Sequence, residues 1–106
     1  MKYEVTLMKV FTTSGVYEIK EHRVKIFPSY FEAQVNNSKN FEIRKNDRNY
    51  QVGDLLLLEE YDPTTENYTG REVHCLITYM TAFKQKPGYV VLGTRKLGVV
   101  RIKEAF

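Results

Sequence analysis

Short segments of alternating apolar and polar residues recur along the chain, and this two-residue period is typical of half-buried β-strands. Residues 2–11 place Tyr3, Val5, Leu7 and Phe11 at alternating positions. A Thr-Thr-Ser-Gly turn follows, and residues 16–20 then return as a second strand, which predicts a hairpin at the start of the chain.

The rest of the chain continues the β pattern. Residues 55–58 are four consecutive leucines, and a strand without alternation is expected to be covered on both faces. Residues 62–70 are rich in Thr, Asn, Pro and Gly, which indicates a loop. Further strands are predicted at residues 23–27, 40–45, 72–80, 89–92 and 99–102.

A single helix is predicted at residues 29–36. Ser29 can cap its N-terminus while Glu32, three residues later, reaches back in a capping box. Phe31 and Val35 lie four residues apart and would share the face that packs on the sheet. Many short strands with one helix indicate a mainly β, α+β fold, and we expect a small barrel or sandwich, since a closed barrel leaves no exposed sheet edge.

Composition narrows the class of protein. The chain has 106 residues with 42% hydrophobic content, which favours one domain over residues 1–106. It holds one cysteine, Cys75, which we expect to be a buried thiol, so no disulfide is expected within the chain. Its two histidines lack the spacing of metal ligands, and we expect no metal site and no cofactor. Since apolar runs of membrane-spanning length are absent, we expect no membrane association and a cytoplasmic location.

Charge is spread unevenly along the chain, although the formal net charge is only +3. Lys and Arg outnumber Asp and Glu by nine to six in residues 1–53 and by six to one in residues 82–106, whereas residues 54–72 carry one cation and six acids. Two basic ends therefore flank an acidic middle. Basic segments of this kind favour an anionic partner, or else form an ordinary solvated surface.

Residues 37–44, Asn-Ser-Lys-Asn-Phe-Glu-Ile-Arg, gather the candidate chemistry. Alternation places Glu42 and Arg44 on one face of the predicted strand, and we expect Phe41 and Ile43 to face the core from the other. Lys39 precedes this strand in a loop. Arg and Lys can bind phosphates, and a carboxylate can accept a hydrogen bond from the amine of a base.

This segment resembles the Gly-x-Lys-x-x-Glu-x-Arg signature of ASCH-like domains, with Asn37 in place of the glycine. The resemblance extends over residues 22–93 and is strongest to an uncharacterised ASCH-like family of small bacterial and phage proteins. It implies a PUA-like pseudo-β-barrel with one short helix beside a cleft. Residues 1–21 and 94–106 would then be β extensions of the recognisable core.

The resemblance implies that RNA or a nucleotide is the partner, because the better-known PUA-like domains bind RNA. Tyr30, Tyr61 and Tyr68 can supply stacking faces for bases. We therefore predict a ligand site formed by the residues of the motif, of the turn after it and of a later hairpin: Lys39, Glu42, Arg44, Asn46, Asp47, Arg48, Tyr68 and Arg71.

Three alternatives stay open. Glu42 and Arg44 can instead form a solvated ion pair of small energetic value. Some small ASCH-like proteins resemble amidohydrolases of acylated cytidine, and here Lys39 matches their lysine while Glu42 replaces their threonine nucleophile. If the protein were an enzyme, Lys39 and Glu42 would be its catalytic candidates. We expect that it has no enzymatic activity. The protein could also be an interaction adaptor that binds another protein through the acidic hairpin 59–72. We expect a monomer by default.

Overall fold

A computed structural model describes residues 5–101 of the chain. It contains six strands and one helix in this range. The elements follow one another as β1 (Val5–Thr12), β2 (Gly15–Ile26), α1 (Pro28–Val35), β3 (Phe41–Lys45), β4 (Leu55–Asp62), β5 (Asn67–Thr81) and β6 (Tyr89–Arg101). The predicted α+β class with one short helix is confirmed.

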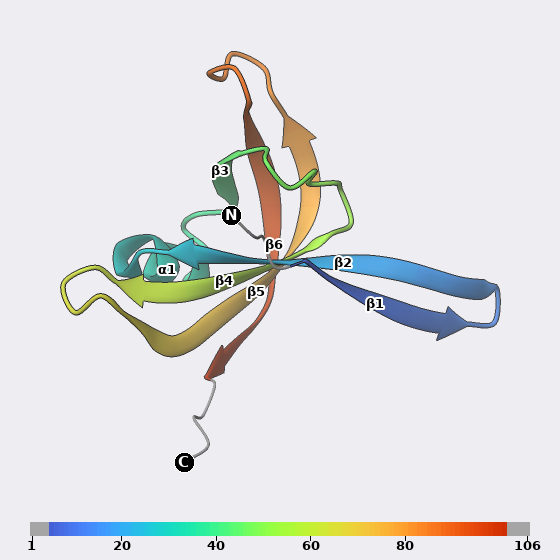
Figure 1. Cartoon of the computed structure of the whole chain (residues 1–106), viewed down its shortest axis with the longest axis horizontal. Helices are drawn as coiled ribbons and strands as arrows, with labels where there is room; N and C mark the ends of the chain where they lie inside the picture. Colours follow the sequence, from blue (N-terminus) through green and yellow to red (C-terminus); the bar gives the residue numbers. More distant parts are fainter. Residues whose placement is uncertain (1–4, 102–106) are drawn as a thin grey trace.

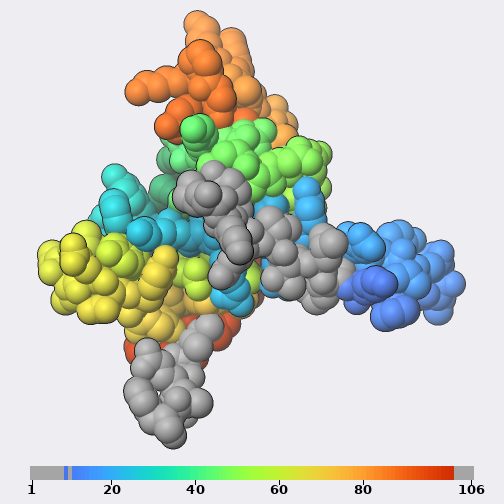
Figure 2. All heavy atoms as spheres, in the orientation of Figure 1, coloured from blue at the N-terminus to red at the C-terminus, as the bar shows by residue number. Residues whose placement is uncertain are grey.

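The strands form one sheet in the order β1-β2-β4-β5-β6-β3. Neighbours pair antiparallel except β2 and β4, which are parallel because α1, β3 and a loop intervene between them. Three hairpins project from the centre as separate arms: β1–β2 in blue, β4–β5 in yellow and β5–β6 in orange (Figure 1). The space-filling view shows the same arms (Figure 2).

A closed barrel was expected, and the sheet is open in the described residues. β1 and β3 are its two edges. The described pairing of β1 with β2 ends at Val5 and His22, so residues 23–26 of β2 have β4 on one side and no described strand on the other. β3 has only five residues and pairs with β6 alone. We call the gap between residues 23–26 of β2 and β3 the seam.

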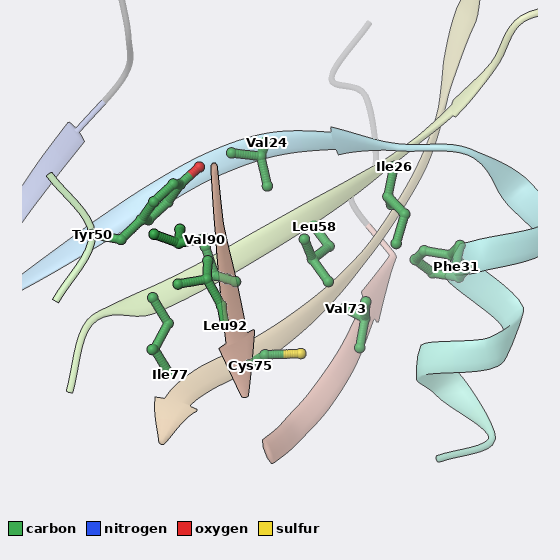
Figure 3. Packing of buried hydrophobic residues seen from close by; sticks show 11 residues of the cluster. Val24, Ile26, Phe31, Tyr50, Leu58, Val73, Cys75, Ile77, Val90 and Leu92 are labelled. Carbon is green, nitrogen blue, oxygen red and sulfur yellow. The ribbon is translucent and has the colours of Figure 1, made fainter. Parts of the chain in front are cut away.

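The hydrophobic core is built mainly from residues of β2, β4, β5 and β6, with α1 at one end. Phe31 projects from the helix toward Ile26 and Val73, while Tyr50 reaches the opposite end of the core from the loop after β3 (Figure 3). Leu56 and Leu58 belong to this cluster, and Leu57 is buried on the other face of β4. The prediction that the leucine run is a strand covered on both sides is therefore confirmed.

Several predicted boundaries differ from the structure. Residues 16–20 and 23–26 belong to the single strand β2, which ends before Phe27, and residues 89–92 and 99–101 belong to β6, which is described as far as Arg101. The helix begins at Pro28 with Phe27 at its N-cap position and no side-chain cap. Proline suits the first helical position, since its missing N–H would have no helical partner there. The predicted capping box is wrong, because Glu32 bonds to Arg71 instead.

Candidate functional site

A pocket of about 550 Å³ lies at the seam. β2 supplies one wall and β3 the other, while the start of α1 and the loop before β3 supply the rest. The lining combines three cations, one carboxylate and several aromatic or aliphatic side chains: Lys25, Ile26, Phe27, Tyr30, Lys39, Phe41, Glu42, Ile43 and Arg44. We call this hollow the seam pocket.

The two faces of β3 are reversed relative to the sequence prediction. Glu42 is only 3% exposed, whereas Phe41 and Ile43 are 42% and 53% exposed. Register explains the reversal, because Glu42 is the cross-strand partner of buried Leu92 in β6, and cross-strand partners share a face. Phe41 and Ile43 were predicted to face the core and instead line the seam pocket.

Glu42 is the centre of an ion cluster. Its Oε1 accepts hydrogen bonds from Nε and Nη2 of Arg44 at 3.2 and 2.9 Å. Its Oε2 accepts from Nε2 of Gln34 at 2.9 Å and from the ammonium of Lys39. A buried carboxylate is tolerated only with such partners. Because all of these donors converge on it, Glu42 holds the two cations in place at the pocket.

Lys39 reaches Glu42 because of the backbone turn before it. Asn37 has a φ of 63°, the left-handed conformation that glycine and asparagine tolerate best, as its place in the predicted motif required. The backbone N–H of Lys39 then bonds to the carbonyl of Ala33 at 3.0 Å. The Lys39 ammonium lies 5.6 Å from the centre of the Tyr30 ring and 5.1 Å from that of Phe41, within reach of cation–π attraction.

Two arginines bridge the seam from the β3 side. Nη2 of Arg44 donates to the carbonyl of Lys25 at 2.9 Å, and Nη1 of Arg48 donates to the carbonyl of Arg23 at 2.8 Å. These carbonyls are two residues apart on β2, so they point to the same strand edge. Side-chain hydrogen bonds therefore occupy the place where a closed barrel would have strand pairing.

Asn46 and Asp47, which follow β3, have local structural partners. The side-chain oxygen of Asn46 accepts a hydrogen bond from the backbone N–H of Tyr50 at 3.1 Å. The backbone N–H of Asn46 donates to the carbonyl of Gly88 at 2.8 Å. Asp47 lies 3.7 Å from the Arg48 guanidinium. Within the described residues, none of Asn46, Asp47 and Arg48 lines the seam pocket.

Arg71 anchors the helix to the β4–β5 hairpin. It donates to both carboxylate oxygens of buried Glu60, at 2.9 and 3.0 Å, and to Glu32 of α1 at 2.7 Å. Its guanidinium also lies over the Phe31 ring, 4.7 Å from the ring centre. Hydrogen bonds to Glu60 and then Glu32 raise the pKa of Arg71 above its ordinary value. These contacts place Arg71 outside the described lining of the pocket.

Tyr68 is exposed and does not line the seam pocket. Its ring meets that of Tyr61 edge to face, with ring centres 5.1 Å apart. The ammonium of Lys25, which lines the pocket, lies 4.0 Å from the centre of the Tyr61 ring. Lys25 therefore connects the tyrosine pair to the rim of the seam pocket.

The acidic middle of the chain is largely paired within the fold. Glu72 accepts from Arg23 at 2.7 Å and lies 2.8 Å from the ring nitrogen of His74, and Glu59 lies 3.4 Å from Arg23. Glu60 belongs to the Arg71 cluster described above. These carboxylates stabilise the β2–β4–β5 region, which reduces the charge that hairpin 59–72 offers to a partner.

The sequence analysis missed several residues of the site: Gln34, Lys25, Phe27, Phe41 and Ile43. Gln34 carried a usable signal, since an amide on the same helix face as Phe31 is expected to find a buried partner. Phe41 and Ile43 carried none, because alternation groups residues by face without showing which face is buried.

Cys75 and His22 are buried and do not line the pocket. Burial raises the pKa of the Cys75 thiol to about 11, so this cysteine is protonated at neutral pH. Nε2 of His22 lies 2.7 Å from Asp54, and the His22 ring packs against Tyr50. Across residues 5–101, no three His, Cys, Asp or Glu side chains cluster to hold a metal, and no helix is long and apolar enough to cross a membrane.

Comparison with known proteins places this site in context. A family model described as "Domain of unknown function (DUF3850)" matches residues 21–94, which include every residue that lines the seam pocket. The chain is also 38% identical over 81 residues to an uncharacterized 12.9 kDa protein in the GpA 3' region of Escherichia phage P2. The aligned segment covers 76% of this chain and 72% of the phage protein.

Proposed function

Because this chain belongs to the DUF3850 family, a family without an assigned function, we propose that it binds RNA or a nucleotide in the seam pocket, as an ASCH-type module of the PUA-like class. The open sheet with one helix beside a pocket is compatible with that class. The proposal rests on the chemistry of the pocket, since fold alone does not define function.

The composition of the seam pocket is the observation that carries the proposal. Lys25, Lys39 and Arg44 supply three positive charges against the single carboxylate of Glu42. Tyr30 and Phe41 are about half exposed and supply ring faces in the same hollow. A nucleotide needs both elements, because its phosphate is attracted to cations and its base stacks on aromatic rings. An unstacked base of single-stranded RNA satisfies this geometry.

Glu42 acts in this proposal by positioning the cations. Its oxygens already accept from Gln34, Lys39 and Arg44, so the carboxylate fixes the two cations at the pocket wall. Lys39 has three N–H donors, and the hydrogen bond to Glu42 uses one of them. The other two can bind a phosphate oxygen. Preorganised donors reduce the entropy lost on binding.

The test is a salt titration of RNA binding. A labelled single-stranded RNA is titrated with the parent protein and with Lys39→Gln, and fluorescence anisotropy gives the affinity at several salt concentrations. If Lys39 binds a phosphate, its loss should weaken binding and reduce the slope of log K against log salt by about 0.7, the value for one contact to single strands. Lys9→Gln removes the same charge from the exposed β1–β2 hairpin and should leave the slope unchanged.

Two results would contradict the proposal. One is a parent protein that binds no RNA, single-stranded DNA or nucleotide at low salt. The other is an affinity that does not change with salt, because phosphate contacts necessarily release counterions. Circular dichroism of each variant checks that the fold is retained.

A further inference from the structure

The outer face of β3 continues from the seam pocket onto β6. Phe41, Ile43 and Lys45 are the exposed residues of β3 on this face, and their partners in β6 are Gly93, Val91 and Tyr89. Since cross-strand partners share a face, these six residues form one surface, which we call the outer face. It runs along β3 for about 13 Å, the length of four strand steps.

A second hollow of about 270 Å³ lies at the far end of the outer face. Its lining consists of Ile43, Gln85, Lys86 and Tyr89. Ile43 also lines the seam pocket, so the two hollows share this side chain. In Figure 2 the tip of the β5–β6 hairpin, in orange, stands beside the green surface of β3 and the loop that follows it. We call the second hollow, which Ile43, Gln85, Lys86 and Tyr89 line, the tip site.

The wall of the tip site is fixed by backbone hydrogen bonds. Gln85 N–H donates to the carbonyl of Ala82 at 3.1 Å, and Tyr89 N–H donates to that of Lys86 at 3.0 Å. Gly88 has a φ of 84°, which favours glycine, and its carbonyl accepts from the N–H of Asn46 after β3. The hairpin tip is therefore tied to the end of β3, and the tip site is formed before a ligand arrives.

The chemistry of the tip site repeats that of the seam pocket. Tyr89 is 38% exposed and offers an aromatic face, and Lys86 lines the same hollow. Lys84 and Lys45 are exposed nearby, on the hairpin tip and on the outer face. Residues 82–88 contain two lysines and no acid. Cations interleaved with aromatic rings are the arrangement that single-stranded nucleic acids bind.

We propose that the tip site is a second nucleotide subsite, so that the ligand is a single-stranded oligonucleotide that runs from the seam pocket across Ile43 to Tyr89 and Lys86. This inference rests on the proposed function and specifies its ligand class. A strand bound in the seam pocket has to leave it, and the outer face offers an exposed apolar path to a second cationic hollow.

Nuclear magnetic resonance can locate both subsites in the whole chain. A mononucleotide should shift the amide signals of the seam-pocket residues within 25–30 and 39–44 and leave those of residues 85–89 unchanged, whereas a pentameric single-stranded RNA should shift both sets. A pentamer that shifts only the seam-pocket amides would overturn the second subsite and leave the proposed function standing. Ligands that shift neither set would overturn both.

Substitutions at the tip site supply the matched test. Tyr89→Ala should weaken pentamer binding between about fivefold and about 150-fold, which corresponds to the 1 to 3 kcal/mol of one stacked base, and should leave mononucleotide affinity unchanged. Lys86→Gln should also weaken pentamer binding and reduce its salt slope. Tyr17→Ala and Lys9→Gln, on the exposed β1–β2 hairpin, are the controls.

Three outcomes would reject the tip site as a nucleotide subsite. The first is equal pentamer affinity in Tyr89→Ala, Lys86→Gln and the parent. The second is an equal loss of mononucleotide and pentamer affinity in Tyr89→Ala, which would indicate a distorted seam pocket. The third is a concentration-dependent dimer in sedimentation that Tyr89→Ala abolishes, because a second copy of the chain would then cover the outer face.

Discussion

A buried carboxylate is expensive to remove when its donors stay in place, because they lose their counter-charge or acceptor. Glu42 has three such donors, while its neighbours Phe41 and Ile43 are about half exposed. We expect Glu42→Ala to lower the free energy of unfolding by about 2 to 3 kcal/mol. Phe41→Ala and Ile43→Ala should each cost less than about 1 kcal/mol.

Urea denaturation followed by circular dichroism measures these differences. Residue type alone predicts the opposite order, with the two apolar residues as core positions and the carboxylate at the surface. If Phe41→Ala proves more destabilising than Glu42→Ala, the faces of β3 are assigned wrongly, and the seam pocket loses one wall.

The buried thiol of Cys75 makes stability depend on alkaline pH. Its pKa is about 11 in the folded protein and 9.0 as the ordinary value, so the unfolded chain loses this proton first as the pH rises. Below pH 9 both states keep the proton, and the thiol adds no pH dependence. Between pH 9 and pH 11 the unfolded state binds fewer protons, and stability should fall by at most about 1.4 kcal/mol per pH unit.

Cys75→Ala isolates this effect. Its free energy of unfolding, measured in urea from pH 8 to pH 11, should fall less steeply than that of the parent within the same window. Other groups, such as Tyr50, whose pKa is also raised by burial, titrate in both proteins and cancel in the comparison. Parallel pH profiles would show that Cys75 titrates at its ordinary pKa and is therefore solvated.

Among the elements, α1 and β3 show how far periodicity and turn chemistry reach. The proline at the first position of the helix, the left-handed Asn37 after it and the alternation of β3 are local features, so the sequence predicts where these elements lie. The buried face of β3 depends instead on its register with β6, in which Glu42 is paired with Leu92. Alternation carries no information about such a partner, which is why the faces were assigned wrongly.

The orientation of α1 likewise depends on distant contacts. Glu32 of the helix bonds to Arg71, and Arg71 bonds to Glu60, so three elements meet in one ion cluster. The sequence suggested ligand binding for Arg71 because arginines often bind anionic ligands. It suggested capping for Glu32 because glutamates often cap helices from this position. In the folded chain these contacts hold the helix, and with it Tyr30, beside the seam pocket.

At the scale of the whole molecule, the β-rich class and the position of most strands were accessible from the sequence, while strand number, strand order and the open seam were not. Strand order is set by pairings between distant segments, such as β3 with β6 and β2 with β4. The seam lies where the described pairing of β2 with β1 ends, and side chains of Arg44 and Arg48 bond to β2 where a barrel would have a strand. Its pocket is a consequence of that incomplete closure.

If these two arginines hold the sheet ends together, their contributions should be coupled. Both bond to carbonyls of the same β2 edge, at Lys25 and Arg23, so loss of either bond lets the seam open and weakens the other. Arg44→Gln and Arg48→Gln together should therefore destabilise the protein by at least about 0.5 kcal/mol less than the sum of the single variants. Urea denaturation of the four proteins of this cycle gives the coupling energy.

The control is Arg48→Gln combined with Lys9→Gln, on the distant hairpin. The effects of these two substitutions should be additive within about 0.5 kcal/mol. An additive Arg44 and Arg48 pair would mean that the two bonds act independently and that the seam is held by the core beneath it.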